Sequence, residues 1–367
     1  MQLRRNRILH AISRARSHAT RQVGCCVTIT VARYEGNESE WDGFAREQSG
    51  YTHFHRLRWR TLIDKVFGHD CIYLAARDVE GNLVGVLPLV RVRSVVFGHY
   101  LVSMPFLNYG GPLGTQEGIR ALVNEAVALA QSEKVKLLEL RNRTAIETPL
   151  GASHRKVTVV LDLPSTAEEL FNRFDPKLRS QIRRPLKAGA SVRFGRDQIA
   201  PFFRVFSQHM RDLGTPSQPL AFFQEIARQF PDDSWFACAY IDGSPVAAGC
   251  GFCFGDEFEM SWAASLRAFN RESPNMLLYW ACMQRAIGEG LTCFNFGRCT
   301  PGTGAHRFKL QWGGREEPLW WYGFAASVGA TTPSPDDRAF RWGPGIWRHL
   351  PTSIATKVGP SIVRFIP

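Results

Sequence analysis

The sequence lacks several features that would assign it quickly to a known class. A membrane-spanning helix needs about 18 or more consecutive apolar residues, and no run of that length occurs among the 367 residues. A GxSxG elbow, a Walker loop and an HExxH motif are also missing, which excludes the usual serine hydrolase, P-loop nucleotidase and zincin mechanisms. Carboxylates are few, with 33 Asp and Glu against 45 Lys and Arg. The net charge of +12 favours acidic partners such as phosphorylated sugars, RNA or anionic lipid.

Cysteine usage argues against a secreted disulfide scaffold. The nine cysteines are odd in number and scattered through probable strands and helices, a pattern typical of free thiols in a reducing compartment. Cys250 and Cys253 form a CxxC pair, but they lie in an apolar strand-like run where positions three apart point to opposite faces. Because no second CxxC or histidine cluster accompanies them, we expect core packing and no metal site.

Length and composition divide the chain into four parts. A chain of this length exceeds the usual size of one core, so two domains are expected. Residues 1–26 carry six arginines and no carboxylate, yet lack the hydrophobic stretch of a signal peptide, and form a basic extension. We expect domains over 27–155 and 156–325, followed by a linker and an amphipathic tail over 326–367.

A weak internal repeat predicts the architecture of the two domains. Apolar triplets of helical spacing correspond between the halves: Trp59, Ile63 and Phe67, then Phe222, Ile226 and Phe230. A probable β-hairpin follows each triplet, with Gly81 matching Gly243 in its turn. An amphipathic helix and a short strand complete each half: 119–130 and 136–140 in the first, 276–287 and 292–296 in the second. This order predicts mixed sheets covered by helices, with ligands at strand ends.

The stretch from Ser273 to Gly314 has the strongest features of a ligand site. Ser273 is expected to cap a helix that Gly288 and Gly290 stop. A strand then leads into a glycine-containing loop, whose main chain could approach an anionic or carbonyl group beside cationic donors. The candidate residues are Asn295, Gly297, Arg298, Thr300, Gly302, Gly304, His306, Arg307 and Lys309. A solvated basic turn is the alternative.

Two further segments carry candidate substrate-binding residues. In the first half, a position comparable to that loop is occupied by Asn108, Tyr109, Gly110 and Gly111, although Tyr-Gly-Gly-Pro is also ordinary turn chemistry. Arg179 and Arg183 lie four apart in a run of seven cations without a carboxylate between 177 and 196. They could bind phosphates of a nucleotide-linked sugar, a lipid diphosphate or tRNA, or form a solvated face. Pro185 should end or kink this helix.

Carboxylates and the tail leave alternatives open. Glu257 and Glu259 alternate along a probable strand and should share a face, either as candidate proton acceptors or as exposed strand residues. In the tail, apolar residues recur four apart beside basic ones: Ile346, Leu350, Ile354 and Val358. This tail could make a peripheral contact with an anionic membrane surface or dock onto its own domains.

The duplicated order and three sequence strings resemble the FemAB family. The strings are YGGP at 109–112, KLRSQIRRPLKAG at 177–189 and FNFGRCTPGTGAHRFKLQWGG at 294–314. The resemblance covers about residues 27–325 and is strongest to the FemAB-related branch found beside exosortase (PEP-CTERM) exopolysaccharide loci. It implies an α/β (α+β) fold of two tandem GNAT-like acyltransferase domains, with mixed sheets flanked by helices.

The resemblance also implies a reaction. Well-studied FemAB members transfer an amino acid from aminoacyl-tRNA to an amine of a peptidoglycan precursor, so an amide-forming acyltransferase is expected, acting on a nucleotide- or lipid-linked peptidoglycan or exopolysaccharide precursor. Phe308 and Lys309, with Gly313 and Gly314 behind them, match the family pattern. Lys309 is therefore implied, together with Arg298, to stabilise an acyl oxyanion or a substrate phosphate.

The acyl donor is left open between aminoacyl-tRNA and acyl-CoA, and no tightly bound cofactor is expected. CoA-dependent GNAT enzymes hold the pyrophosphate on an R/Q-x-x-G-x-G/A loop, whereas the corresponding junction, LRAFNRESPN at 266–275, contains no glycine. The long helical arm associated with tRNA contact is also missing. The rival functions are a CoA-dependent N-acyltransferase acting on an amino sugar and a non-catalytic binding subunit of a polysaccharide machine. A cytoplasmic location at the inner face of the membrane is expected.

Overall fold

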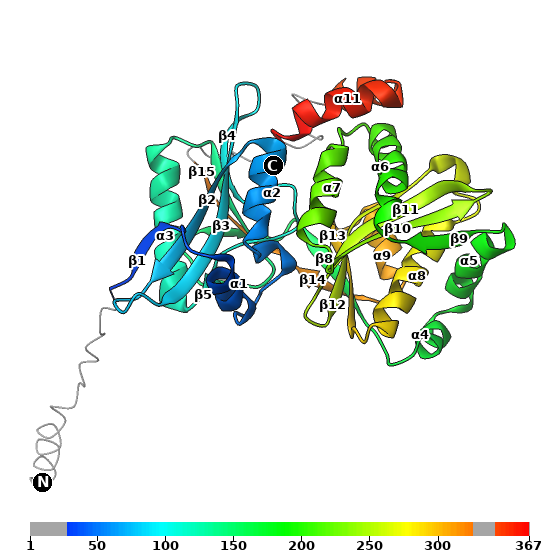
Figure 1. The fold of residues 1–367 in the computed structure, drawn as a ribbon, viewed down its shortest axis with the longest axis horizontal. Coiled ribbons are helices and arrows are strands. Elements are labelled where there is room, and N and C mark those ends of the chain that lie inside the picture. The colour runs from blue at the N-terminus through cyan, green and yellow to red at the C-terminus, as the bar shows by residue number, and fades with distance from the viewer. Residues whose placement is uncertain (1–27, 326–341, 367) are drawn as a thin grey trace, which may run out of the picture.

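Two lobes, each built on one mixed β-sheet, lie side by side in the computed structural model (Figure 1), which describes residues 28–325 and 342–366. The predicted basic extension over 1–26 and most of the predicted linker lie outside these residues. Among the helices of the described ranges, none combines the length and the apolar character needed to cross a membrane.

The first lobe contains an eight-stranded sheet with the order β1-β2-β3-β4-β6-β15-β7 and β5 paired to β3. Its strands are β1 (Thr30–Arg33), β2 (Asp70–Arg77), β3 (Leu83–Ser94), β4 (Gly98–Ser103), β5 (Leu113–Gly114), β6 (Leu137–Asn142), β7 (Gly151–Ser153) and β15 (Trp320–Ala325). Its helices are α1 (Glu38–Arg46), α2 (Arg58–Phe67), α3 (Gln116–Ser132) and a 3-10 turn, η1 (His53–His55).

The second lobe contains a seven-stranded sheet with the order β14-β8-β13-β12-β11-β10-β9. Its strands are β8 (Val157–Asp162), β9 (Ser191–Phe194), β10 (Ser234–Ile241), β11 (Ser244–Phe254), β12 (Glu257–Ser265), β13 (Cys293–Cys299) and β14 (Arg315–Pro318). Its helices are α4 (Ala167–Arg173), α5 (Pro176–Lys187), α6 (Ile199–Leu213), α7 (Leu220–Gln229), α8 (Pro274–Gly288) and α9 (Gly304–Leu310), with 3-10 turns η2 (Arg196–Gln198) and η3 (Arg267–Phe269). The chain ends in α10 (Trp342–Trp347) and α11 (Thr352–Val363).

The structure confirms the predicted repeat. Both predicted hairpins form, as β2–β3 and β10–β11, and Gly81 and Gly243 lie in their turns with φ of 88° and 74°. The predicted second helices and strands appear as α3 with β6 and as α8 with β13. In the first sheet β4 pairs in parallel with β6, and in the second β12 pairs in parallel with β13. The other strand pairs of both sheets are antiparallel.

The two parallel pairs are short and then separate. In the second lobe the pairing covers residues 257–259 against 293–295 and stops there. Gly297 explains the divergence, because its φ is 71° and a Cβ on it would lie 2.6 Å from the main-chain oxygen of Met260. The strand ends beyond this point open toward the first lobe, which places Arg298 and Ser261 at the junction between the lobes.

The two repeated apolar triplets meet across that junction. The Trp59 ring of α2 lies 4.9 Å from the Phe230 ring and 6.4 Å from the Phe222 ring, and the Phe67 ring lies 5.3 Å from the Phe222 ring. One continuous hydrophobic core therefore contains buried residues of both lobes. Burying two facing aromatic helices removes large apolar areas from water, which fixes the lobes against each other.

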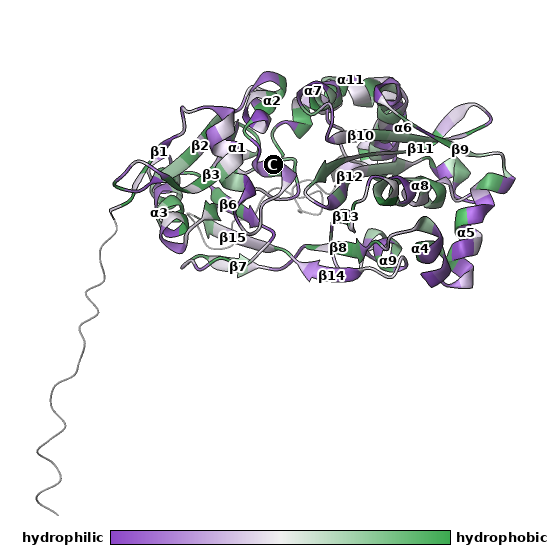
Figure 2. Ribbon diagram, turned by 60° about the horizontal axis from the view of Figure 1, so that its bottom comes forward, coloured by the Kyte–Doolittle hydropathy of each residue, from purple (hydrophilic) through white to green (hydrophobic). Residues whose placement is uncertain are grey.

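The main chain crosses twice between the sheets. It passes from β7 to β8 and returns from β14 to β15, and the Leu319 amide donates to the Lys156 carbonyl at 3.0 Å between the crossings. In Figure 2 these four strands lie along the lower edge of the molecule. The return brings β15 into the first sheet beside β6, so residues 320–325, which the sequence grouped with the second domain, complete the first lobe. This pairing is non-local, and no periodicity reports it.

Two local expectations need correction. Ser273 occupies the N-cap position of α8, but its backbone is left-handed at φ 56° and its hydroxyl makes no capping bond. Pro274 disfavours the right-handed helical region for Ser273, but it favours extended backbone and does not account for the left-handed conformation. Pro185 does not end α5, which continues to Lys187.

Substituting Trp59 by alanine should weaken the whole molecule rather than one lobe. We expect a loss of about 3–5 kcal/mol in the free energy of unfolding, because the indole is fully buried among aromatic rings of both lobes. Urea unfolding should still give one transition. Leu186→Ala, at a residue that is 54% exposed, should change stability by less than about 0.5 kcal/mol. Two separate transitions in the unsubstituted protein would contradict the shared core.

Candidate functional site

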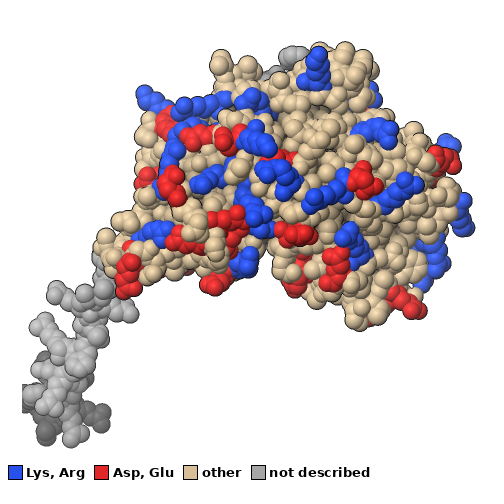
Figure 3. All heavy atoms as spheres, viewed as in Figure 1, with Lys and Arg blue, Asp and Glu red and all other residues tan. Residues whose placement is uncertain are grey.

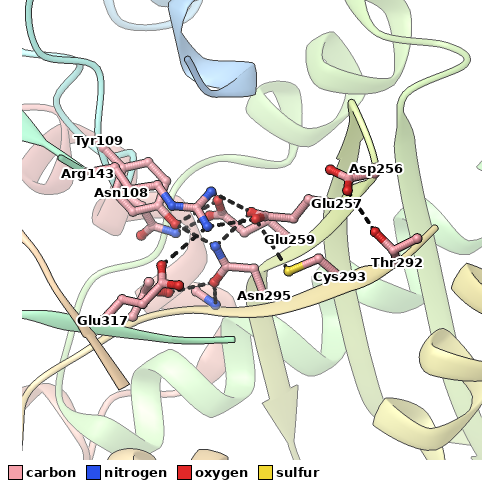
Figure 4. Close-up of polar contacts among 12 residues, drawn as sticks. Asn108, Tyr109, Arg143, Asp256, Glu257, Glu259, Thr292, Cys293, Asn295 and Glu317 are labelled. Carbon is pink, nitrogen blue, oxygen red and sulfur yellow. Dashed lines mark hydrogen bonds and ion pairs between the residues drawn. The ribbon is translucent and has the colours of Figure 1, made fainter. Parts of the chain in front are cut away.

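A buried carboxylate lies where the lobes meet. Glu259 of β12 is fully buried and accepts hydrogen bonds from the Asn108 side-chain amide, the Tyr109 hydroxyl (2.8 Å) and the Ser261 hydroxyl (3.2 Å). Asn108 and Tyr109 belong to the first lobe, in the loop between β4 and β5. Figure 4 shows these side chains pointing toward one another from the two lobes. The predicted Asn108–Tyr109 segment therefore reaches the second lobe's strand ends.

Asn295 extends this network along β13. Its amide nitrogen donates to the Tyr109 hydroxyl at 3.0 Å and to Glu257 Oε1 at 2.8 Å. Its carbonyl oxygen accepts from the Thr158 hydroxyl at 2.6 Å and from the Gly297 amide at 2.8 Å. All four hydrogen-bonding positions of the amide are thus used, so its orientation is fixed.

The second carboxylate, Glu257, is tied to the first lobe. Arg143 donates two hydrogen bonds to it, at 2.9 and 2.7 Å, in the two-pronged geometry that suits a guanidinium and a carboxylate. Glu257 and Glu259 share the face of β12 that the sequence predicted. Both are buried, so the alternative of exposed strand residues is excluded.

Burial changes the acidity of Glu259. Removal from water raises the pKa of its carboxyl to about 7, and the nearby charge of Glu257 adds to the rise. The hydrogen bonds from Asn108 and Tyr109 oppose this shift. A carboxyl with a pKa near 7 can both accept and release a proton at neutral pH, which is the property that a general base needs.

A guanidinium with unused donors lies close to this carboxyl. Within the described ranges, the Arg298 side chain makes no hydrogen bond or ion pair, and its only recorded partner is the Trp321 ring, 5.0 Å from its central carbon. Burial and the neighbouring charge of Arg141 lower the pKa of Arg298 to about 10, and the carboxylate of Glu259 opposes this shift. The group therefore stays cationic at neutral pH, with hydrogen-bond donors available for a ligand.

Arg298 lines a cavity of about 220 Å³ between the lobes. Asn108 and Ser261, two of the donors to Glu259, lie in the same wall. Aromatic side chains form much of the remainder: Phe54, Phe106, Phe206 and Trp262. The wall thus combines aromatic side chains with a few convergent polar groups, as small-molecule sites usually do.

Strand β15 contributes a platform for the cation. The Trp321 ring lies between two guanidinium groups, with the central carbon of Arg141 at 4.7 Å and that of Arg298 at 5.0 Å. Arg141 is also paired with Glu139 at 2.8 Å. The indole holds the Arg298 side chain without occupying its hydrogen-bond donors, as cation–π contacts do.

Lys309 has a different environment from the one expected. It is buried, and its ammonium donates to the main-chain carbonyls of Gly297 at 2.6 Å and Arg298 at 3.0 Å. Burial lowers its pKa to about 8. Lys309 thus fixes the backbone that carries Arg298, and it does not line the cavity between the lobes.

The remaining polar side chains of the predicted glycine loop form hydrogen bonds with other parts of the protein or within the loop. Thr300 accepts from Lys156 at 2.7 Å, His306 pairs with Glu316 at 2.5 Å, and Arg307 donates to the Gly302 carbonyl at 2.8 Å. Gly302 and Gly304 are exposed, and a Cβ on either would meet open space. This loop lies outside the interlobe cavity.

Other predicted residues divide between the junction and the periphery. Gly110 and Gly111 pack behind Tyr109, where a Cβ on Gly111 would lie 2.1 Å from the Asn142 side chain. Arg179 and Arg183 lie on α5, at the outer edge of the second lobe away from the first (Figures 1 and 2). Lys and Arg gather at that edge in Figure 3. These arginines are therefore not brought together with Glu259.

A second cavity of about 500 Å³ lies on the other side of the network. It is lined from both lobes, by Arg143 and Arg56 on one side and Glu257 and Asp233 on the other. His53 also lines it, and its buried Nε2 has no hydrogen-bond partner at 3.8 Å from the Asp233 carboxylate. Burial lowers the pKa of His53 to about 4, so the ring is neutral at pH 7. Mixed charges and a spare donor suit a polar ligand.

Sequence reasoning missed Arg141, Arg143 and Trp321. The repeat held a signal for the arginines, since the string Arg-Asn-Arg spans the end of β6 as Gly-Arg lies near the end of β13. Trp321 had no such signal, because it reaches the site only through the pairing of β15 with β6. Among the described residues, no cluster of histidine, cysteine and carboxylate side chains is suited to hold a metal ion.

A comparison with known families finds a match within the second lobe. Residues 173–310 match the acetyltransferase (GNAT) domain family. The first lobe repeats the same order of helices and strands. The fold consists of two tandem GNAT-like domains. No curated protein gives a significant sequence match.

Solved structures share this fold at low sequence identity. The crystal structure of FemX superposes with a TM-score of 0.60 at 15% identity, covering 79% of this chain and 96% of that one. L-PGS from Bacillus licheniformis gives 0.52 at 13% identity, with 90% and 97% covered. The C-terminal domain of a putative lysylphosphatidylglycerol synthetase from Agrobacterium fabrum gives 0.51 at 13%, with 78% and 90% covered. These likenesses concern the fold.

Titration of Glu259 should be visible by infrared spectroscopy. We expect a protonated-carboxyl band that disappears with a midpoint near pH 7 and is absent from Glu259→Gln. In Glu257→Gln the midpoint should fall, because a neighbouring negative charge is removed. A midpoint for Glu259 near the ordinary value of 4.5 would contradict the assignment.

Stability should follow the same titration. Because the folded-state pKa lies above the unfolded one, the folded protein binds the proton more tightly, and its stability falls as pH rises from 4.5 to about 7. Across that pH window, the free energy of unfolding of Glu259→Gln, measured with urea, should rise relative to that of the unsubstituted protein by up to about 3 kcal/mol.

Proposed function

We propose that this protein is an acyltransferase that forms an amide on a cell-envelope precursor at the junction of its two lobes. The proposal is carried by one observation. A buried carboxyl with a pKa near neutrality, Glu259, lies beside Arg298, whose guanidinium lines the interlobe cavity with unused donors. The GNAT match of the second lobe and the FemX-like fold support the reaction class.

The chemistry needs a proton acceptor and a site for developing negative charge. The nitrogen of the acceptor amine attacks the acyl carbonyl carbon, a C–N bond forms, and the bond from carbon to the donor's oxygen or sulfur breaks. Glu259, which is reached through the Ser261 hydroxyl in the cavity wall, takes the proton that the amine loses and passes it to the leaving oxygen or sulfur. Arg298 stabilises the negative charge that develops on the carbonyl oxygen. Lys309 acts as a positioning residue through the carbonyls of Gly297 and Arg298.

The two cavities offer places for two reactants. The wall of the cavity beside Arg298 contains aromatic side chains and a single charged one, whereas the cavity beside Glu257 and Arg143 carries charges of both signs. We propose that the acyl group enters the first, and that the polar part of the acceptor binds in the second. The donor is either aminoacyl-tRNA or acyl-CoA. At the start of α8 the junction has no glycine, which disfavours the usual CoA pyrophosphate loop.

The charge of the chain and its structural neighbours support the proposed acceptor class. A net charge of +12 suits an anionic, nucleotide- or lipid-linked precursor of peptidoglycan or exopolysaccharide. Neighbours in fold include a putative lysylphosphatidylglycerol synthetase. We place the protein at the inner face of the membrane, with a peripheral contact through its C-terminal tail. Arg179 and Arg183 of α5 are proposed to attract the anionic precursor, or tRNA, from the periphery.

Replacing Arg298 by methionine should abolish most activity without unfolding the protein. Removing one donor to a developing oxyanion lowers kcat by about 10²–10³-fold. Within residues 28–325 and 342–366 the Arg298 side chain makes no hydrogen bond that the fold would lose. The matched control is Arg307→Met, since Arg307 is exposed and bonds only to a loop carbonyl. That variant should retain full activity. The readout is the acylated fraction of envelope precursors, measured by mass spectrometry in cells complemented with each variant.

The same assay tests the proposal as a whole. Precursors from cells without the gene should lack one acyl increment, and purified protein should restore it with only one of the two donors. Lys309→Met should lower both activity and thermal stability, because two carbonyls lose their donor. An unchanged precursor pool in all strains, including Arg298→Met, would favour the non-catalytic binding subunit. If the purified protein acylates an amino sugar with acyl-CoA as donor, the CoA-dependent N-acyltransferase function would be favoured.

A further inference from the structure

The tip of the β3–β4 hairpin exposes apolar side chains in a fixed turn. Val95 is fully exposed and Val96 is 76% exposed. The turn is ordered by the Ser94 hydroxyl, which accepts hydrogen bonds from the amides of Val96 at 3.2 Å and Phe97 at 3.1 Å. In Figure 1 this tip projects beyond the sheet at the upper edge of the first lobe. Two aliphatic side chains are thus held in water by a rigid support.

The C-terminal helix exposes apolar side chains as well. Small residues of α11, Ala355 and Gly359, are buried against the body of the protein, whereas Ile354 and Val358 remain 47% and 43% exposed. The helix is anchored at its start by Arg211, which donates to the Leu350 carbonyl at 3.0 Å. The sequence left open whether this tail docks or meets a membrane. The docked face consists of the small residues, and the larger aliphatic residues point outward.

Both apolar points lie at the same end of the molecule. The hairpin begins where Arg91 pairs with Asp70 and extends past that residue. The end of α11 reaches the neighbouring residue, because the Arg364 carbonyl lies 2.6 Å from the His69 ring nitrogen. Figure 1 shows the hairpin tip and α11 together at the top.

Both segments carry basic residues and no carboxylate of their own. The hairpin sequence from 91 to 100 and the tail from 344 to 366 contain Arg, Lys and His but no carboxylate. Arg93, beside the tip, is 63% exposed, and Lys357 is exposed between the two aliphatic residues of α11. In Figure 3 the upper edge is mainly uncharged, and the charged side chains there are Lys and Arg. Carboxylates lie at the base of the hairpin, where Asp70 and Glu133 pair with Arg91 and Arg93. At the tip and along α11, exposed aliphatic groups beside exposed cations match the chemistry of an anionic lipid surface.

We propose that the β3–β4 tip and α11 form one face that seats the protein on an anionic lipid bilayer. A protein partner would need a contiguous complementary patch, whereas a projecting tip and a separate helix suit a planar, deformable surface. Membrane binding by this face does not depend on the proposed function. Only the further conclusion, that the acceptor is lipid-linked, rests on it. Gly359 of α11 packs against Ser217, and the next residue, Gln218, lines the cavity of Arg298. A lipid-linked acceptor at this face is therefore adjacent to the reacting groups.

The test is sedimentation of the full chain with vesicles of phosphatidylcholine, with or without phosphatidylglycerol. We expect binding only to the anionic vesicles. Val96→Asp and Ile354→Asp should each weaken vesicle binding by about tenfold or more, because an aliphatic group that enters the bilayer is replaced by a charge. The matched control is Val79→Asp. Val79 is also a valine, is 76% exposed in the β2–β3 turn, and lies at the opposite end of the same strands.

Three outcomes would contradict the proposed membrane-binding face. Failure to bind anionic vesicles, equal binding to neutral vesicles, or equal loss in Val79→Asp and Val96→Asp would overturn it. Self-association that Val96→Asp abolishes, without vesicle binding, would assign the face to a second copy of this chain. Arg298→Met should bind vesicles as the unsubstituted protein does. Loss of acyl transfer and loss of membrane contact are thereby measured separately.

Discussion

The burial of one carboxylate between two lobes is the constraint on which the site depends. Glu259 cannot be removed from water unless donors replace its hydration, and the first lobe supplies two of them, Asn108 and Tyr109. The lobes must therefore be in register for the carboxylate to be tolerated at all. Facing aromatic helices, α2 and α7, enforce that register through an apolar core common to both sheets.

Around this carboxylate, the polar groups divide into those that are satisfied and those that are not. Asn295, Glu257 and Lys309 use their hydrogen-bonding capacity on the protein itself. Arg298 does not, and Trp321 keeps its guanidinium in place through the ring face. A rigid, fully bonded frame around one uncommitted cation is a preorganised arrangement, because no hydrogen bond within the frame has to break before a ligand binds.

How much of this could be predicted from sequence depends on the range of the interaction. Alternation along one strand placed Glu257 and Glu259 on a common face, and the repeat placed Asn108 and Tyr109 at a strand end. The sequence could not show how the glycine loop is bonded, because a run of cations and glycines looks the same whether its donors are free or bonded nearby, as His306 is to Glu316. The partners of β15 and the meeting of α2 with α7 join segments far apart in the chain, which periodicity does not report.

The crossing of β15 into the first sheet has a consequence for synthesis. The first sheet stays incomplete on the ribosome until residues 320–325 have emerged, although most of its strands are made before residue 143. Until then the edge of β6 is an open row of main-chain donors and acceptors. Truncation before Trp320 would remove the strand that covers this edge and the ring beside Arg298 together. The nascent chain thus completes the polar site between its lobes only after residue 325 has emerged.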